Sequence, residues 1–141
     1  MTAAPDGEIA LESGGLPALP THTPPEFDGP GGRWSPETLL AGAVADCFVL
    51  TFRAIAKASK LPWVSVDVAC TGTLERIERV TRFTRFDLHA TLVLPDGAGD
   101  ADQARRLLAR AEETCLITRS LNSEVHLTMD IVRAPALQEV R

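Results

Sequence analysis

The sequence predicts an α+β fold in which a long buried helix packs against mostly antiparallel sheets. Three observations predict it. A long apolar helical pattern begins after residue 34, two alternating stretches follow between residues 64 and 94, and a third alternating stretch follows an amphipathic helix near the end. Because the chain has 141 residues, we expect one domain over residues 1–141, with residues 1–33 as N-terminal strands and a loop.

The first 33 residues are rich in glycine and proline. "EIALES" (8–13) and "LPALP" (16–20) are compatible with short edge strands. "THTPPEFDGPGGR" (21–33) is predicted to be a loop, because paired prolines and glycines interrupt both helices and strands.

The first helix has a clear start. Ser35 suits the N-cap, Pro36 the first helical position, and Glu37 the first turn. The apolar residues that follow cover most of the circumference, which predicts burial on most sides: Leu39, Leu40, Ala43, Val44, Cys47, Phe48 and Ala54. Since one small sheet cannot cover such a helix, we predict a homodimer in which two of these helices share a core.

Period-two alternation predicts three strands with one buried face each. Val64 to Cys70 and Phe86 to Leu94 alternate with polar residues, and "ERIERVTR" (75–82) between them suggests two long antiparallel strands. "PDGAGD" (95–100) is a turn, residues 101–113 form an amphipathic helix, and "TCLITRSL" (114–121) is a short helix or turn. "EVHLTMDIV" (124–132) is the last strand.

Charge and terminal sequence limit the possible partners and location. A net charge of −5 disfavours a nucleic-acid or anionic-membrane partner. "MTAAPDGEIALESGG" has neither the basic start nor the apolar block of a secretory signal. The longest apolar stretch, Leu39–Phe52, contains Asp46 and is short for a bilayer span. We therefore predict a cytoplasmic protein whose three cysteines are not structural disulfides.

Most familiar site patterns are absent from the sequence. His22, His89 and His126 have no ligand spacing, so we predict no metal site and no cofactor. His89 and His126 are expected on exposed strand faces. The chain also has neither a phosphate-binding P-loop nor a nucleophilic serine elbow.

The cysteines are the remaining candidates. Cys70 falls on the buried face of a predicted strand, where it acts as a small hydrophobe. Cys47, judged alone, is more often a core residue than a reactive one. Cys115 begins a short helical element, where backbone N–H groups can stabilise a thiolate. If the fold brings them together, Cys47 and Cys115 can act as a peroxidatic and resolving pair.

Two segments resemble a known family. "SPETLLAGAVADCF" (35–48) is similar to the first cysteine motif of the OsmC/Ohr family, the osmotically inducible and organic hydroperoxide resistance proteins. "AEETCLITRSL" (111–121) is similar to its second motif. The resemblance covers about residues 34–133, and "LTFRAIAKASKLPW" (50–63) looks like an OsmC-like branch distinct from the founding members.

The resemblance implies an intertwined α+β homodimer with two active sites at the interface. The family's activity is thiol-dependent reduction of organic hydroperoxides in oxidative stress defence, with a thiol or dithiol, lipoyl in the Ohr branch, as reductant. Cys47 matches the peroxidatic cysteine and Cys115 the resolving one. Glu37 matches a glutamate that orients an arginine beside the reactive sulfur.

The arginine is where this chain departs from the family pattern. Family members supply it from the N-terminal region, but Glu26 stands near the expected place, and Arg33 is the only arginine in residues 1–36. Arg33 is therefore the first candidate, and Arg82 and Arg85 are the others. Two other functions stay open: a non-catalytic protein that binds an apolar small molecule at the dimer cleft, and a redox sensor that signals through a Cys47–Cys115 disulfide.

Overall fold

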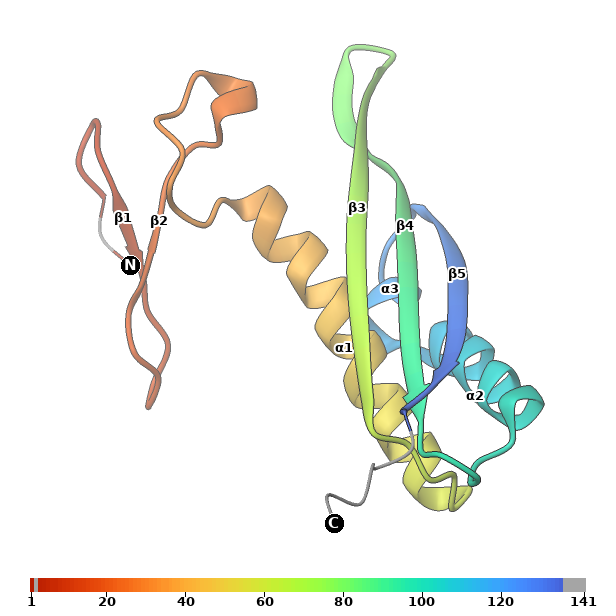
Figure 1. The fold of residues 1–141 in the computed structure, drawn as a ribbon. Coiled ribbons are helices and arrows are strands. Elements are labelled where there is room, and N and C mark those ends of the chain that lie inside the picture. Colours follow the sequence, from red (N-terminus) through yellow and green to blue (C-terminus); the bar gives the residue numbers. More distant parts are fainter. Residues whose placement is uncertain (2, 136–141) are drawn as a thin grey trace. The chain divides into compact units, whose positions relative to one another are not determined.

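The computed structural model describes residue 1 and residues 3–135, and the chain divides into two compact units, Met1–Gly42 and Ala43–Arg141 (Figure 1). The prediction of a single domain over residues 1–141 stays a prediction. In chain order, the elements are β1 (Ile9–Leu11), β2 (Leu19–Thr21), the 3-10 helix η1 (Pro25–Phe27), α1 (Pro36–Ala58), β3 (Ser65–Ile77), β4 (Val80–Leu94), α2 (Ala101–Thr114), α3 (Leu116–Arg119) and β5 (Glu124–Arg133).

The first unit is built on a short antiparallel ribbon of β1 and β2, in which Ile9 pairs with Thr21. The following loop returns to this ribbon before α1 begins, because Thr21 forms a bridge with Trp34. The backbone N–H of His22 donates to the Trp34 carbonyl at 2.9 Å. β1 lies within the predicted strand 8–13, whereas β2 shares only residues 19–20 with the predicted strand 16–20 and extends to Thr21, which was predicted to begin the loop.

The predicted start of α1 is confirmed. The Thr38 N–H donates to Ser35 Oγ at 3.2 Å, while the Ser35 N–H donates to Thr38 Oγ1 at 2.8 Å. This reciprocal pair satisfies backbone donors that the first turn of a helix otherwise leaves free. At the other end, Lys60 adopts a left-handed φ of 54°, and the Leu61 N–H closes the helix on the Ala56 carbonyl at 3.0 Å.

Within one chain, α1 buries only a narrow stripe of its surface. Val44, Phe48, Phe52 and Ala56 are fully buried and recur every four residues. Leu50, on another side of the helix, is 50% exposed. By length and composition α1 could cross a membrane, although the core helix of a soluble protein meets the same criterion. We predicted that α1 is buried on most sides, but within a single chain only one stripe of the helix is buried.

The second unit contains a three-stranded sheet in the order β3-β4-β5. β3 and β4 are antiparallel and turn through Glu78 and Arg79, which have φ of 49° and 70°. β5 runs parallel to β4, because α2 and α3 carry the chain back along the sheet before β5 begins. The α+β class is confirmed, and two of the three strand pairings in the described residues are antiparallel.

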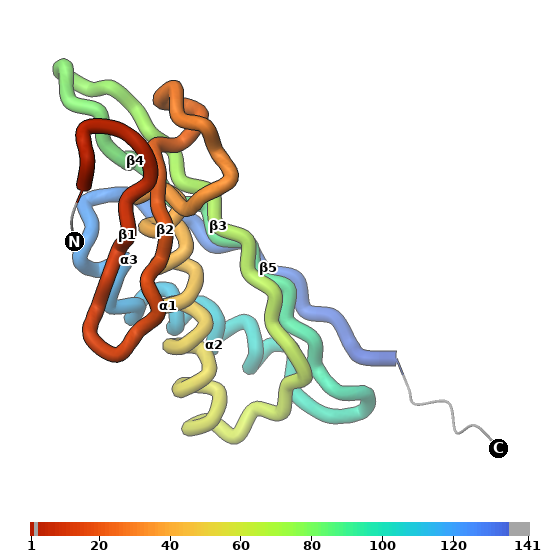
Figure 2. The backbone as a smooth tube through the Cα atoms, turned by 90° about the vertical axis from the view of Figure 1, so that its left-hand side faces the viewer, coloured from red at the N-terminus to blue at the C-terminus, as the bar shows by residue number. Residues whose placement is uncertain are grey.

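The core of this unit lies on one face of the sheet. Both views place α1 and α2 on the same side of β3, β4 and β5 (Figures 1 and 2). The buried side chains of β4 alternate as predicted: Phe86, Leu88, Ala90, Leu92 and Leu94. Val64, predicted to be buried, is 56% exposed because it precedes β3. The sheet thus supports α1, which contains Cys47, and α2, which ends directly before Cys115.

Candidate functional site

Cys47 and Cys115 come from different helical segments and meet in the second unit. Cys47 lies on α1 directly before the buried Phe48 and is half-buried. Cys115 is the one residue between α2 and α3, and its side chain is completely buried. Cys47 and Cys115 are free thiols that lie close enough for each to shift the pKa of the other. The structure therefore brings together the two sulfurs that the sequence separates widely.

The surroundings of Cys47 favour its thiolate. Burial is the largest single effect and raises the pKa of the Cys47 thiol, but the hydrogen bonds to its sulfur together outweigh burial, and the Cys115 thiol and the Ile117 backbone contribute most. The Thr51 hydroxyl, 4.0 Å from Cys47 Sγ, and the Leu116 backbone lower the pKa further. Within residues 1 and 3–135, no charged side chain contributes to this shift. Neutral donors therefore produce the net lowering of the Cys47 pKa.

Cys115 shows the opposite shift. Burial first, and then Cys47, raise the pKa of the Cys115 thiol, whereas the backbone and hydroxyl of Thr118 partly oppose this change. Cys115 is therefore the partner that keeps its proton while Cys47 ionises. We expected the backbone N–H groups of the short helix to serve Cys115. The backbone of Thr118 does favour the Cys115 thiolate, but burial outweighs it, and the backbone of Leu116 and Ile117 favours the Cys47 thiolate.

The local chain explains how the Cys115 sulfur is positioned. α2 ends because Cys115 is extended, with φ −61° and ψ 120°, and α3 starts immediately after it. The Cys115 N–H donates to the Glu112 carbonyl at 3.2 Å, and its own carbonyl accepts from the Arg119 N–H and Thr118 Oγ1, both at 3.1 Å. The Cys115 backbone is thus held from both sides, and this limits the directions its side chain can take.

Arg33 and Glu37 lie in the first unit. Arg33 Nε donates to Glu8 Oε2 at 2.6 Å, and Arg33 Nη1 donates to the Gly32 carbonyl at 3.1 Å. Glu37 Oε2 is buried and has no hydrogen-bond partner among residues 1 and 3–135. The structure therefore joins Arg33 to Glu8 rather than to Glu37. The roles of Arg33 and Glu37 at a reactive sulfur stay predictions.

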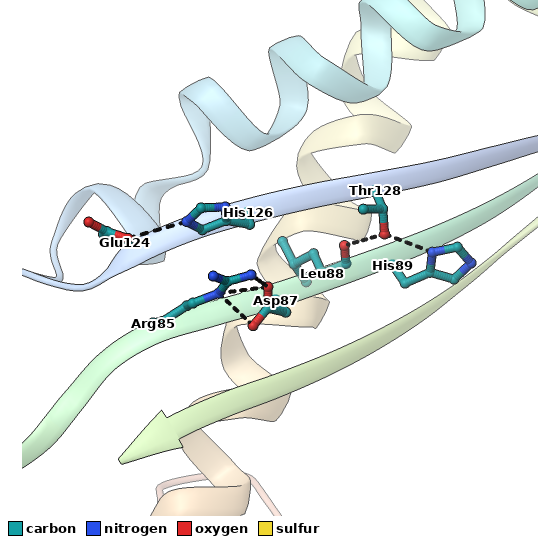
Figure 3. A network of polar contacts seen from close by, with 7 residues as sticks. All are labelled: Arg85, Asp87, Leu88, His89, Glu124, His126 and Thr128. Carbon is teal, nitrogen blue, oxygen red and sulfur yellow. Dashed lines mark hydrogen bonds and ion pairs between the residues drawn. The ribbon is translucent and has the colours of Figure 1, made fainter. Parts of the chain in front are cut away.

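The other two candidate arginines belong to the outer face of the sheet. Arg85 Nε donates to both carboxylate oxygens of Asp87 at 2.8 Å (Figure 3). Arg85 precedes the buried Phe86, so it projects from the face opposite to α1. Arg82 lines a pocket of about 640 Å³ that Arg85 and Asp87 also line. Within the second unit, neither arginine is placed on the side that faces Cys47.

The histidines of the sheet are engaged on that same outer face. His89 Nδ1 lies 2.8 Å from Thr128 Oγ1, and His126 Nε2 lies 3.3 Å from Glu124 Oε2 (Figure 3). Both histidines are exposed, as their strand positions predicted. In the described part of the chain, no three His, Cys, Asp or Glu side chains are grouped so that they could hold a metal ion.

The sequence analysis missed Thr51, Leu116 and Ile117 as neighbours of the Cys47 sulfur. Thr51 follows Cys47 by one helical turn, so the i, i+4 spacing could have identified it. The other two follow Cys115, and only the fold shows that their N–H groups serve the distant cysteine. Cys70, the third thiol, is half-buried on β3, and burial raises its pKa.

Comparisons with known proteins identify a family and a relative of similar sequence. The family model described as "OsmC-like protein" matches residues 29–130. The uncharacterised protein YmaD of Bacillus subtilis (strain 168) is 29% identical over 122 residues, which is 85% of this chain and 81% of that protein.

Two solved structures share the fold. An OsmC-like protein of unknown function from Vibrio cholerae has a TM-score of 0.81 at 20% identity, with 87% of this chain and 84% of that chain covered. An organic hydroperoxide resistance protein OsmC from Legionella pneumophila, also described as a predicted redox protein, has a TM-score of 0.67 at 25% identity. That match covers 92% of this chain and 99% of the other.

Proposed function

This chain belongs to the family of OsmC-like proteins, and from that membership we propose that it is a thiol-dependent peroxidase that reduces organic hydroperoxides. The observation that carries the proposal is the pairing of Cys47, whose thiol pKa is lowered, with Cys115, whose thiol pKa is raised. A peroxidatic cysteine must be a thiolate, whereas a resolving cysteine can wait as a thiol. The name of the Legionella relative points to the same substrate class.

In the first step, the Cys47 thiolate attacks the terminal oxygen of the hydroperoxide. The O–O bond breaks, the sulfur becomes a sulfenic acid, and the organic alkoxide leaves and takes up a proton to form an alcohol. Val44 and Phe48, which are close to Cys47 in the chain, are apolar and fully buried, and apolar surroundings favour an organic rather than a small polar peroxide.

In the second step, the Cys115 sulfur attacks the sulfenic sulfur of Cys47. A disulfide forms, and the hydroxyl group leaves as water together with the Cys115 proton. The mutual effect of the two thiols on their pKa values supports this step, because it requires the two side chains to be near each other. An external thiol or dithiol, of which a dihydrolipoyl group is one example, then returns both cysteines to the reduced form.

We further propose that Glu37 orients an arginine, with Arg33 as first candidate, so that a positive charge supports the reacting sulfur. For this role the Arg33 guanidinium has to exchange its ion pair with Glu8, which is about half exposed. The buried Glu37 Oε2, which has no hydrogen-bond partner within the described part of the chain, is an available acceptor for such a donor.

The assembly we propose is a homodimer in the cytoplasm, without nucleic-acid or membrane partners. The part of α1 that one chain leaves exposed includes Leu50, and a second α1 is the cover that the family resemblance implies. A reducing cytoplasm would also keep the three cysteines as thiols between turnovers.

The test is turnover with cumene hydroperoxide and a dithiol. The Cys47→Ser variant should lose all activity, while the matched Cys70→Ser variant should keep it. Activity that survives in Cys47→Ser would remove the assignment. The same cysteine pair would also suit a redox sensor, which would oxidise once without sustained turnover, and a binding protein would keep its thiols after peroxide.

A further inference from the structure

The hairpin of β3 and β4 extends past the three-stranded sheet. Among the described residues, β5 pairs with β4 only from Arg85 onward, so residues 74–83, here called the hairpin arm, form a ribbon of two strands. Figure 1 shows this arm extending beyond the start of β5. The pairing register shifts between Thr73 and Leu74, and such a β-bulge bends a strand at the point where the arm leaves the sheet. The hairpin arm is therefore a separate structural feature.

The hairpin arm exposes apolar side chains to solvent. All its residues except Phe83 are exposed. Leu74, Ile77 and Val80 are 36%, 42% and 59% exposed, and Ile77 is paired with Val80 across the two strands. An isolated two-stranded hairpin is only marginally stable in water, and grouped exposed apolar residues mark interaction sites. We therefore expect another surface to cover the hairpin arm in the assembled protein.

The hairpin arm also carries positive charge on an acidic protein. It contains three arginines and two glutamates, whereas the whole chain has a net charge of −5. In the part of the chain that the structure describes, no ion pair within 4.0 Å engages Arg76, Arg79 or Arg82. Glu75 accepts a hydrogen bond from Thr84 Oγ1. Arginines beside exposed apolar side chains favour a partner that is acidic.

The first unit of the chain has the complementary charge. Residues 1–42 contain six acidic side chains and one basic side chain, that of Arg33, which is already paired with Glu8. Their net side-chain charge of −5 equals that of the whole chain, so the remaining residues are balanced. Asp6 and Glu12, on either side of β1, are both exposed. The first unit is thus the part of this protein that attracts a basic surface most strongly.

We propose that the hairpin arm of one molecule docks on the acidic first unit of a second copy of this chain. The inference rests on the homodimer proposed above and names surfaces that join its two copies. In a dimer with twofold symmetry, each copy supplies one arm and receives one, so the contact forms twice. Burial of Ile77 and Val80 contributes the apolar part of the contact, while the arginines fix its orientation.

The experiment compares dimer dissociation constants by sedimentation velocity. Arg76→Glu/Arg79→Glu makes the arm acidic and should raise the dissociation constant at least about tenfold in about 0.05 M NaCl, because like charges then face each other. The increase should shrink in about 0.5 M NaCl, where charges are screened over shorter distances. The matched control, Arg106→Glu/Arg110→Glu, makes the same change of charge at exposed positions of α2 and should keep the wild-type value.

A second variant, Asp6→Lys/Glu12→Lys, changes the charge of the first unit and supplies the reciprocal test. Alone, it should also dimerise more weakly than the wild type. Mixed with the arm variant, it should form heterodimers well above the statistical half in native mass spectrometry. Each acidic arm then meets the lysines introduced on its partner, and each unchanged basic arm meets an unchanged acidic unit. Such heterodimers also show that both variants are folded.

An arm variant that dimerises as tightly as the α2 control would overturn the inference. A mixture without excess heterodimer would also overturn it, as expected if the arm docks within its own chain or on an acidic protein of another kind. A monomeric wild-type protein would overturn both this inference and the homodimer on which it rests. None of these measurements uses a peroxide, so failure of the proposed peroxidase activity is detected separately.

Discussion

The thiols of Cys47 and Cys115 have pKa values that the structure shifts in opposite directions. Hydrogen bonding from Cys115 helps to lower the pKa of Cys47 below its usual value despite burial, and Cys47 helps to raise the pKa of Cys115 above its usual value. A neutral donor beside an ionised acceptor stabilises one charge and disfavours the second. Cys47 is thus the nucleophile of the pair and Cys115 the thiol that stays protonated, and no charged side chain among the described residues contributes to the lowering of the Cys47 pKa.

The contribution of Cys115 to the ionisation of Cys47 can be measured by pH-dependent alkylation with iodoacetamide in a Cys70→Ser background. Alkylation speeds up as pH rises through the pKa, so a lowered pKa places the midpoint below that of an ordinary cysteine. Cys115→Ala removes a donor to the thiolate and should move the midpoint up by about one pH unit, whereas Cys115→Ser keeps a hydroxyl donor. Identical midpoints in all three proteins would exclude this contribution.

The identity of the supporting arginine is open to direct comparison. If Arg33 supplies positive charge near the leaving oxygen, Arg33→Gln should slow the oxidation of Cys47 by cumene hydroperoxide about tenfold. Glu8→Gln removes the ion-pair partner of Arg33 and should not slow this oxidation. Arg82→Gln and Arg85→Gln change the outer face and should have little effect. Stopped-flow thiol oxidation gives the rates. A normal rate in Arg33→Gln combined with a slow Arg85→Gln would reverse the assignment.

Gly72 should be required for the packing of the aromatic pair on β4. A Cβ at Gly72 would lie 2.6 Å from Cε1 of Phe83 and 3.1 Å from Cε1 of Phe86, whose rings stack with centroids 4.9 Å apart. Gly72→Ala must displace these rings and should lower the free energy of unfolding by about 1 kcal/mol in urea denaturation. Gly14→Ala is the control, because its new Cβ meets no atom within 4 Å. Equal stability of the two variants would contradict this packing account.

The proposed dimer depends on the apolar side of α1 that one chain leaves uncovered. Leu50→Glu places a charge on that side and should convert the dimer to a monomer in sedimentation velocity. Leu16→Glu, at a position 68% exposed in the first unit, is the matched control and should remain dimeric. A wild-type protein that sediments as a monomer at all concentrations would contradict the proposal.

Much of the fold follows from local signals. Ser35 and Pro36 locate the start of α1, and the alternation from Phe86 to Leu94 identifies the buried face of β4. The direction of β5 does not follow from such signals, because alternation is the same in parallel and antiparallel strands. The direction of β5 depends on the connection through α2 and α3, which returns the chain to the end of the sheet where β4 begins.

The site was predictable only in part. The positions of Cys47 and Cys115 could be singled out from the sequence, but their contact depends on how α1 packs against the α2–α3 junction. For the same reason, the N–H groups after Cys115 could not be assigned to Cys47 from sequence. Such donors act through space, and no local pattern of residues identifies their acceptor.

The most direct test of the central claim is to count thiols and map disulfides after adding one equivalent of cumene hydroperoxide to the fully reduced protein. We predict that two of the three cysteines are lost to thiol reagents, that the tryptic map contains a Cys47–Cys115 disulfide, and that Cys70 stays free. Three unchanged thiols, or a disulfide that includes Cys70 in place of Cys115, would contradict the account.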